Sequence, residues 1–153
     1  MSAGAFGGMA TQWGTKGNLA LEDDDAIIIR SNAAGAAFRN LTLTDAFHMS
    51  IEYWKRTSSL NMVQMAADED GDFTFVIAHH DQGIHNWLDT GGLEYGTLFL
   101  RCYRAETLSP PETTLLKQDN LVQAVRSSAC CSQEERRTQI DERREGVARL
   151  LCD

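Results

Sequence analysis

Short apolar runs with a period of two constrain the fold of this chain more than any other feature. In "FTFVIA", Phe73 to Ala78, alternate residues point to opposite faces of a strand, and both rows are apolar. "AAFRNLTLT" and "YGTLFLRCYR" repeat the pattern, and turn-forming residues separate the runs. A strand that is apolar on both faces is covered on both sides. The runs therefore predict sheets packed face to face.

Two segments resemble β-hairpins. "NLALEDDDAIIIRS" places two apolar runs around three consecutive aspartates. "NMVQMAADEDGDFTFVIAHH" contains Asp70-Gly71, a dipeptide that tolerates positive φ in a tight turn. We expect a hairpin at each segment, with the second turn over residues 68–72.

The period changes after a pair of prolines, which we expect to end the strand region. "NLVQAV" predicts a short helical piece. Ser132 followed by Glu135 is a capping box, and Ile140, Val147 and Leu151 then recur on one helical face. Arginines and acids alternate along the same segment, which is typical of a solvated helix. A docking site for an acidic partner is the alternative.

These patterns predict a mainly β protein, an antiparallel β-sandwich of jelly-roll type with one or two C-terminal helices. The expected organisation is a flexible N-terminal segment over 1–17, the sandwich domain over 18–109 and a helical extension over 110–153. We expect the extension to pack on the sandwich or on a partner. A chain of 153 residues has the size of one domain.

Charge and cysteine content narrow the class of protein. A net charge of −8 argues against nucleic acid and membrane surfaces as main partners. The apolar runs are too short to span a bilayer, and the first residues lack the pattern of a secretory signal. The four cysteines lack zinc-ribbon spacing, so we expect reduced thiols in a soluble, cytoplasmic protein.

"HHDQGIHNWLDTGG", residues 79–92, gathers three histidines, two aspartates, an asparagine and a tryptophan between two expected strands. Long connections are uncommon unless they are functional. A metal site is one interpretation, but the spacing matches neither the helical zinc motif nor the His-x-His pattern of cupins. We therefore predict neither a metal nor a cofactor.

Two other interpretations of this loop stay open. A histidine beside an aspartate is an oriented imidazole that can move a proton. Alternatively, aspartate and asparagine side chains bond to nearby backbone amides and shape turns, while the tryptophan fills the core. In that case the loop is a rigid crossover without chemistry.

"AHHDQGIHNWLDTGGLEYGTLFLRCY" resembles the signature of the bacterial family labelled domain of unknown function 1214. The upstream "YWKRTSSLN" and the tail "SQEERRTQIDERREGVAR" are also similar to that family. Gln82 stands where the family pattern has proline, and Tyr103 stands where it has tryptophan. The matching positions are His79, Asp81, Gly83, Asn86, Trp87, Leu88, Asp89, Thr90, Gly91, Gly96 and Arg101.

The resemblance implies a jelly-roll-like sandwich, here standing alone, that forms the C-terminal part of longer family members. It implies no established chemistry. We predict a small-molecule-binding domain. A more specific hypothesis is that the domain is an enzyme that acts on an apolar or anionic metabolite. The expected site lies at the sandwich mouth, with His79, Asp81 and Asp89 as catalytic candidates. Asn86, Trp87 and Arg101 are the expected ligand contacts, Arg101 binding an anion.

A non-catalytic structural or assembly module is the alternative function. Edge strands of a sandwich invite pairing with another chain. The arginine-rich helix could hold a second copy, giving a homo-oligomer, or a separate chain that replaces the N-terminal part of the family. Under this hypothesis Asn86 and Asp89 serve stability.

Overall fold

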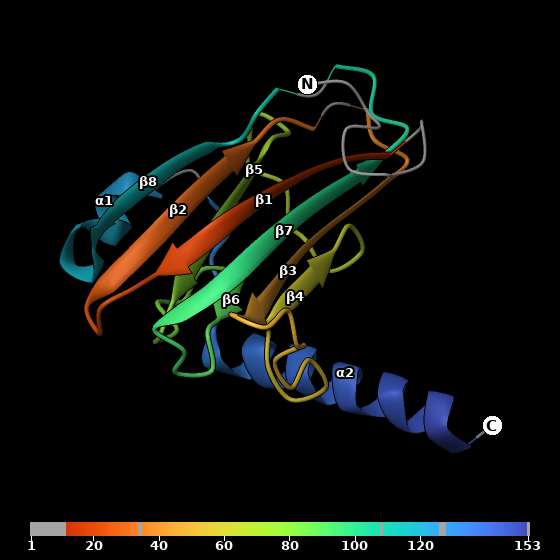
Figure 1. The fold of residues 1–153 in the computed structure, drawn as a ribbon. Coiled ribbons are helices and arrows are strands. Elements are labelled where there is room, and N and C mark those ends of the chain that lie inside the picture. The colour runs from red at the N-terminus through yellow and green to blue at the C-terminus, as the bar shows by residue number, and fades with distance from the viewer. Residues whose placement is uncertain (1–11, 34, 108, 126–127, 153) are drawn as a thin grey trace.

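The computed structural model describes residues 12–33, 35–107, 109–125 and 128–152. These residues form a mainly β sandwich of two four-stranded sheets with helices at the C-terminal end (Figure 1). One sheet has the order β1-β7-β3-β4 and the other has the order β6-β5-β2-β8. The predicted fold class is confirmed.

The strands of the first sheet are β1 (Gln12–Ala20), β7 (Tyr95–Tyr103), β3 (Phe38–Asp45) and β4 (Ser59–Asn61). Those of the second are β6 (Trp87–Asp89), β5 (Phe73–Ala78), β2 (Asp25–Ser31) and β8 (Glu112–Lys117). The helices are the short η1 (Gln118–Asn120) and α1 (Leu121–Ala124), and the long α2 (Gln133–Cys152). Within these described residues, no helix has both the length and the apolarity needed to cross a bilayer.

Neither predicted hairpin exists. β1 pairs with β7, whereas β2 pairs with β5 and β8 in the other sheet, so the three aspartates turn the chain from one layer to the other. The second turn is present, with Gly71 at φ 86°. The residues that should form the first arm of this hairpin do not pair with β5; the Gln64 and Met65 amides donate to the Asn61 carbonyl in a turn after β4. Both errors have one cause: local patterns identify strands and turns, while long-range packing selects the partners.

The sandwich extends beyond the predicted limits at both ends. Residues 12–17 belong to β1, and the remainder of the expected flexible segment, 1–11, lies outside the described residues. After the prolines the chain forms β8, an edge strand whose side chains are almost all exposed. β8 has no two-row apolar pattern, since five of its six residues are exposed to solvent.

Two apolar cores flank the second sheet. The larger core lies between the sheets, and Phe75, Ile77 and Leu100 are among its buried members. A smaller core covers the outer face of the second sheet, where Trp87 packs with Leu121 of α1. The central strands β2 and β5 of that sheet are therefore apolar on both faces, as their sequences indicate. One pair in the sheet, β5 with β6, is parallel.

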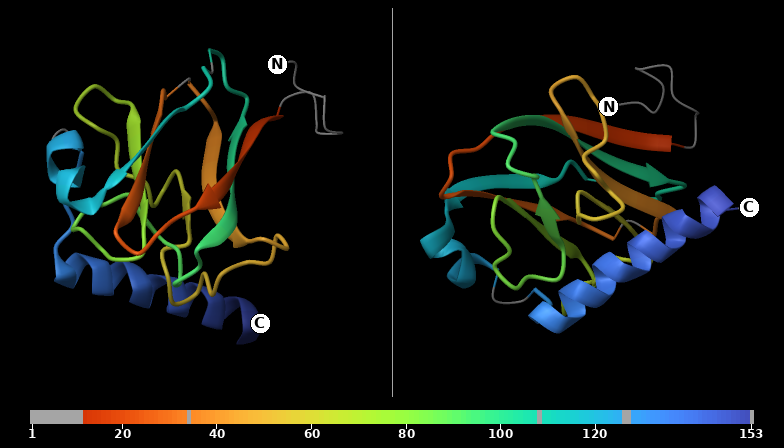
Figure 2. Two further views of the ribbon diagram at one scale, coloured as in Figure 1. Left: turned by 60° about the vertical axis from the view of Figure 1, so that its left-hand side comes forward. Right: turned by 90° about the horizontal axis from the view of Figure 1, so that it is seen from below.

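Helix α2 lies across one end of the sandwich (Figure 2). The predicted capping box is confirmed: the Ser132 amide donates to Glu135, and the Glu135 amide donates to the Ser132 hydroxyl. The predicted apolar face is only partly used, because Leu151 is 81% exposed. Arg136 is the buried residue of this helix instead.

Candidate functional site

The loop after β5 is ordered by its own polar side chains, beginning with Asn86. The buried Asn86 amide donates to the Ala66 and Thr74 carbonyls, at 2.7 and 3.1 Å. Its Oδ1 accepts from the Ala66 amide at 2.8 Å. Both amide hydrogens and the oxygen are thus bonded to backbone, and the side chain has no free donor for a ligand.

Trp87 is a core residue of the outer layer. Its indole Nε1 donates to the Ala78 carbonyl at 3.1 Å, and the side chain is buried beside α1. The Arg136 guanidinium lies over the indole ring, 5.2 Å from the centroid. This cation–π contact adds to the attachment of α2.

The two loop aspartates are paired with arginines. Asp81 Oδ2 lies 2.8 Å from Arg136 Nε, and Asp81 Oδ1 accepts from the Gly83 amide. Asp89 Oδ2 lies 2.9 Å from Arg56 Nη1, and this pairing raises the pKa of the Arg56 guanidinium. Neither carboxylate hydrogen-bonds to a histidine within the described part of the chain, so the predicted His–Asp proton relay is not assembled in this geometry.

The three loop histidines do not converge. His79 Nδ1 lies 2.7 Å from the Thr90 hydroxyl, and its buried Nε2 has no partner among the described residues. His85 Nε2 lies 3.1 Å from the Gln64 carbonyl, on the side that faces α2. His80 is exposed. The loop therefore offers no shared position for an ion.

Among the described residues, three carboxylates outside this loop lie close enough together to hold a cation: Glu22, Asp24 and Asp25. Lys117 Nζ already lies 3.0, 2.7 and 2.8 Å from these three groups. The carboxylates raise the pKa of Lys117, Asp24 contributing most, and Lys117 is the main cause that lowers the pKa of Asp25. The ammonium group thus offsets part of the negative charge of this turn and ties the turn to β8.

Arg101 does not join the loop. It is exposed on β7 between Leu100 and Cys102, which are buried in the inner core. Because side chains alternate along a strand, Arg101 points to the outer face of the first sheet, where its guanidinium lies over the Phe99 ring. The structure therefore does not bring Arg101 together with the loop residues that were expected to share a site with it. Burial also raises the pKa of the Cys102 thiol, which disfavours a reactive thiolate.

Two arginines, the buried Arg39 and the half-buried Arg143, were not identified from the sequence. Arg39 is 1% exposed and donates to the Asn32 and Ala33 carbonyls. Arg143 of α2 donates to the Ser59 carbonyl at 2.6 Å, and burial lowers the pKa of its guanidinium to about 10. Arg143 bonds to a carbonyl 84 positions away, and Arg39 bonds to carbonyls six and seven positions away in the connection before β3, so neither contact follows a strand or helix pattern.

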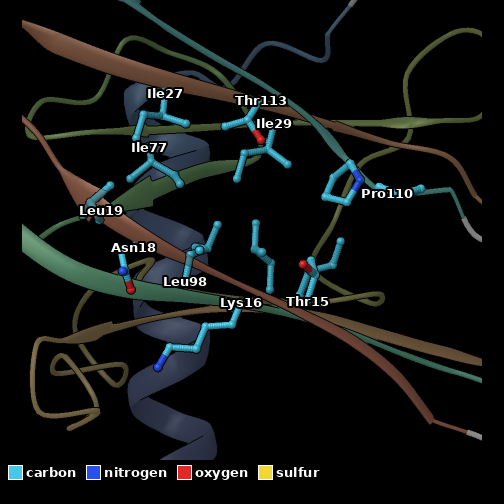
Figure 3. Close-up of a pocket in the computed structure, with 14 residues that line it drawn as sticks. Thr15, Lys16, Asn18, Leu19, Ile27, Ile29, Ile77, Leu98, Pro110 and Thr113 are labelled. Carbon is cyan, nitrogen blue, oxygen red and sulfur yellow. The ribbon is translucent and has the colours of Figure 1, made fainter. Parts of the chain in front are cut away.

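A cavity of about 210 Å³ lies between the two sheets, at the open side bounded by the edge strands β1 and β8 (Figure 3). Isoleucines and leucines from five strands form its walls, and Pro110 and Pro111 border it. The lining residues are Thr15, Lys16, Gly17, Asn18, Leu19, Ile27, Ile29, Leu41, Ile77, Leu98, Leu100, Pro110, Pro111 and Thr113.

Gly17 explains much of this space. It lies opposite Leu98 on the inward row of β1, and a Cβ atom added there would meet nothing within 4 Å. Because Gly17 has no side chain, the space between the two sheets is not filled at the position between Thr15 and Leu19. No predicted site residue lines the cavity. The sequence contains Gly17, but the cavity also needs β8, which sequence patterns did not reveal.

Comparisons with known proteins support the fold. No family model matches the chain, and no curated protein matches it. A solved structure of an uncharacterized protein from Burkholderia cenocepacia is similar, with 26% identity, a TM-score of 0.70 and 74% of this chain covered. The VPA0106 protein from Vibrio parahaemolyticus has 18% identity, a TM-score of 0.54 and 69% of this chain covered. The matched regions make up 32% and 31% of those two chains.

Proposed function

We propose that this domain binds a small apolar molecule in the cavity between β1 and β8. The supporting observation is an open space of about 210 Å³ walled by Ile27, Ile29 and Ile77. A protein cavity of about 150 Å³ holds benzene, so the space accommodates a somewhat larger hydrocarbon. Pockets for drug-sized molecules begin at about 300 Å³, so the occupant is a small molecule or the end of a chain.

Binding without turnover is the form that the geometry favours. Among the described residues that line the cavity there is no histidine, carboxylate or cysteine. Acid–base and nucleophilic catalysis use side chains of those types most often. In the loop that carries such residues, Asp81 and Asp89 bond to loop amides and to arginines, and Asn86 bonds to backbone outside the loop. The loop then acts as support for the sandwich, and the cavity acts as the binding site.

The test is a titration of protein labelled at isoleucine methyl groups with benzene or cyclohexane, followed by NMR. Ile27, Ile29 and Ile77 should shift in a saturable manner. Ile84 of the outer core and Ile140 of α2 are the controls and should not respond. The absence of a saturable shift at the three cavity residues, or an equal response at the controls, would overturn the proposal.

We also infer that the chain corresponds to the C-terminal domain of the family labelled domain of unknown function 1214. The support is the run of matching residues from Asn86 to Thr90, together with the solved relatives, in which the matched region is about a third of the chain. In such proteins the cavity would belong to a longer polypeptide, the rest of which lies outside this domain.

An assembly module is the second candidate function, and one observation favours it. Leu150 and Leu151 are each 81% exposed on the last turns of α2, which project past the sandwich (Figure 1). Apolar residues at an exposed helix end can pack against a second copy of the chain. Sedimentation of the wild type and of the double variant Leu150→Glu, Leu151→Glu tests this: the wild type should dimerise and the variant should not. A monomeric wild type at millimolar concentration would contradict it.

A further inference from the structure

Two threonine hydroxyls from opposite sheets face the cavity. Thr15 of β1 lies opposite Leu100, and Thr113 of β8 lies opposite Ile29. Leu100 and Ile29 both belong to the core between the sheets, so their cross-strand neighbours face the same space. In Figure 3 the hydroxyl oxygens of Thr15 and Thr113 turn toward the cavity.

These two hydroxyls have no hydrogen-bond partner among the described residues, whereas several other threonines of the sandwich are bonded. Thr44, Thr74 and Thr90 each hydrogen-bond to a protein group. Thr15 and Thr113 hydrogen-bond to no protein group within the described ranges. A hydroxyl can both donate and accept, so a ligand group with either capacity can replace the water bound there.

No cation faces the cavity from the residues that line it. Lys16 contributes its backbone and stem, but its Nζ lies 3.1 Å from His48 Nε2 and over the Phe99 ring on the outer face. In Figure 3 the Lys16 ammonium points away from the cavity. A carboxylate buried without a charged partner is strongly unfavourable, so an anionic head group is disfavoured here.

We propose that the cavity selects amphipathic molecules with a short alkyl body and an uncharged hydrogen-bonding head, such as a primary alcohol. Thr15 and Thr113 would be the specificity-determining residues, bonding the head at the mouth while the alkyl body contacts the isoleucines. This inference rests on the proposed binding function and adds the ligand class.

The test compares 1-hexanol, hexane and hexanoate as ligands at pH 7, with the isoleucine methyl shifts as readout. Hexanol should bind about five- to tenfold more tightly than hexane, the difference expected for one or two net hydrogen bonds. Hexanoate should bind more weakly than hexanol. The shape-matched double variant Thr15→Val, Thr113→Val should lose the preference for hexanol and keep the affinity for hexane.

Thr114→Val is the matched control, because Thr114 lies opposite Ile28 and faces the outer core. It should retain the preference. Equal binding of hexane and hexanol by the wild type, or tighter binding of hexanoate, would overturn this inference and leave the apolar site standing. Binding of none of the three ligands would instead overturn the proposed function itself.

Discussion

The loop over 79–92 and the cavity beside β1 differ in what their polar groups are bonded to. The loop carries specialised side chains, and Asn86, Asp81 and Asp89 bond to backbone groups or arginines. The cavity carries ordinary residues, and its two threonine hydroxyls have no protein partner in the described part of the chain. Residue type alone points to the loop, whereas the proposed binding site is the cavity. A group is available to a ligand only when the fold leaves it unbonded.

The bonds of the loop explain what it does. Its backbone pairs with the segment that precedes α2: the His85 amide donates to the Ala129 carbonyl, and the Cys131 amide donates to the Gly83 carbonyl, both at 2.8 Å. Arg136 then joins α2 to the Asp81 carboxylate. The loop is therefore one of the points at which the C-terminal part of the chain attaches to the sandwich.

The largest effect should come from Arg136→Met. The substitution removes the partner of Asp81 and the donor to the Ile84 and His85 carbonyls, which leaves buried groups unpaired. We expect the free energy of unfolding to fall by about 3 kcal/mol. Urea denaturation followed by circular dichroism measures it. The exposed neighbour Arg137→Met is the control, and an equal loss in both variants would contradict the assigned role.

A smaller loss is expected for Asn86→Ala. The Ala66 and Thr74 carbonyls would lose their donor inside the structure, and the free energy of unfolding should fall by about 2 kcal/mol. The folded Asn86→Ala protein should bind cyclohexane with the same affinity as the wild type. A variant with unaltered stability and abolished ligand binding would restore the loop as the functional site. The exposed His80→Ala should change neither quantity.

The smallest effect concerns the start of α2 in acid. Hydrogen bonds from the Ser132 amide lower the pKa of Glu135 below its usual 4.5. The carboxylate thus stabilises the folded state above its unfolded pKa, and this stabilisation is lost as the pH falls through the lowered folded value. Stability measured from pH 6 to 2 should therefore decline less in Glu135→Gln than in the wild type. Parallel curves would show that the capping box does not contribute.

The sequence predicted the strands and helices better than it predicted which strands pair and which side chains bond. β3, β5 and β7 were identified because their side chains alternate, and the α2 cap because Ser132 and Glu135 are local. β8 was missed, since an edge strand with exposed threonines has no alternating apolar pattern. The loop residues were found, but the partner of Asp81 lies 55 positions away, and no short pattern links them. The cavity exists partly because Gly17 has no side chain. The sequence shows the glycine, but the space beside it follows only from the packing of both sheets.

The most direct test compares two glycines of the same strand. Gly17→Val puts methyl groups into the cavity, whereas Gly14→Val puts them on the outer face of β1, and neither Cβ atom would meet another atom closer than 3.6 Å. The account predicts that Gly17→Val weakens cyclohexane binding at least about tenfold, while Gly14→Val leaves it unchanged. Equal affinity in the two folded variants would contradict the placement of the binding site between the sheets.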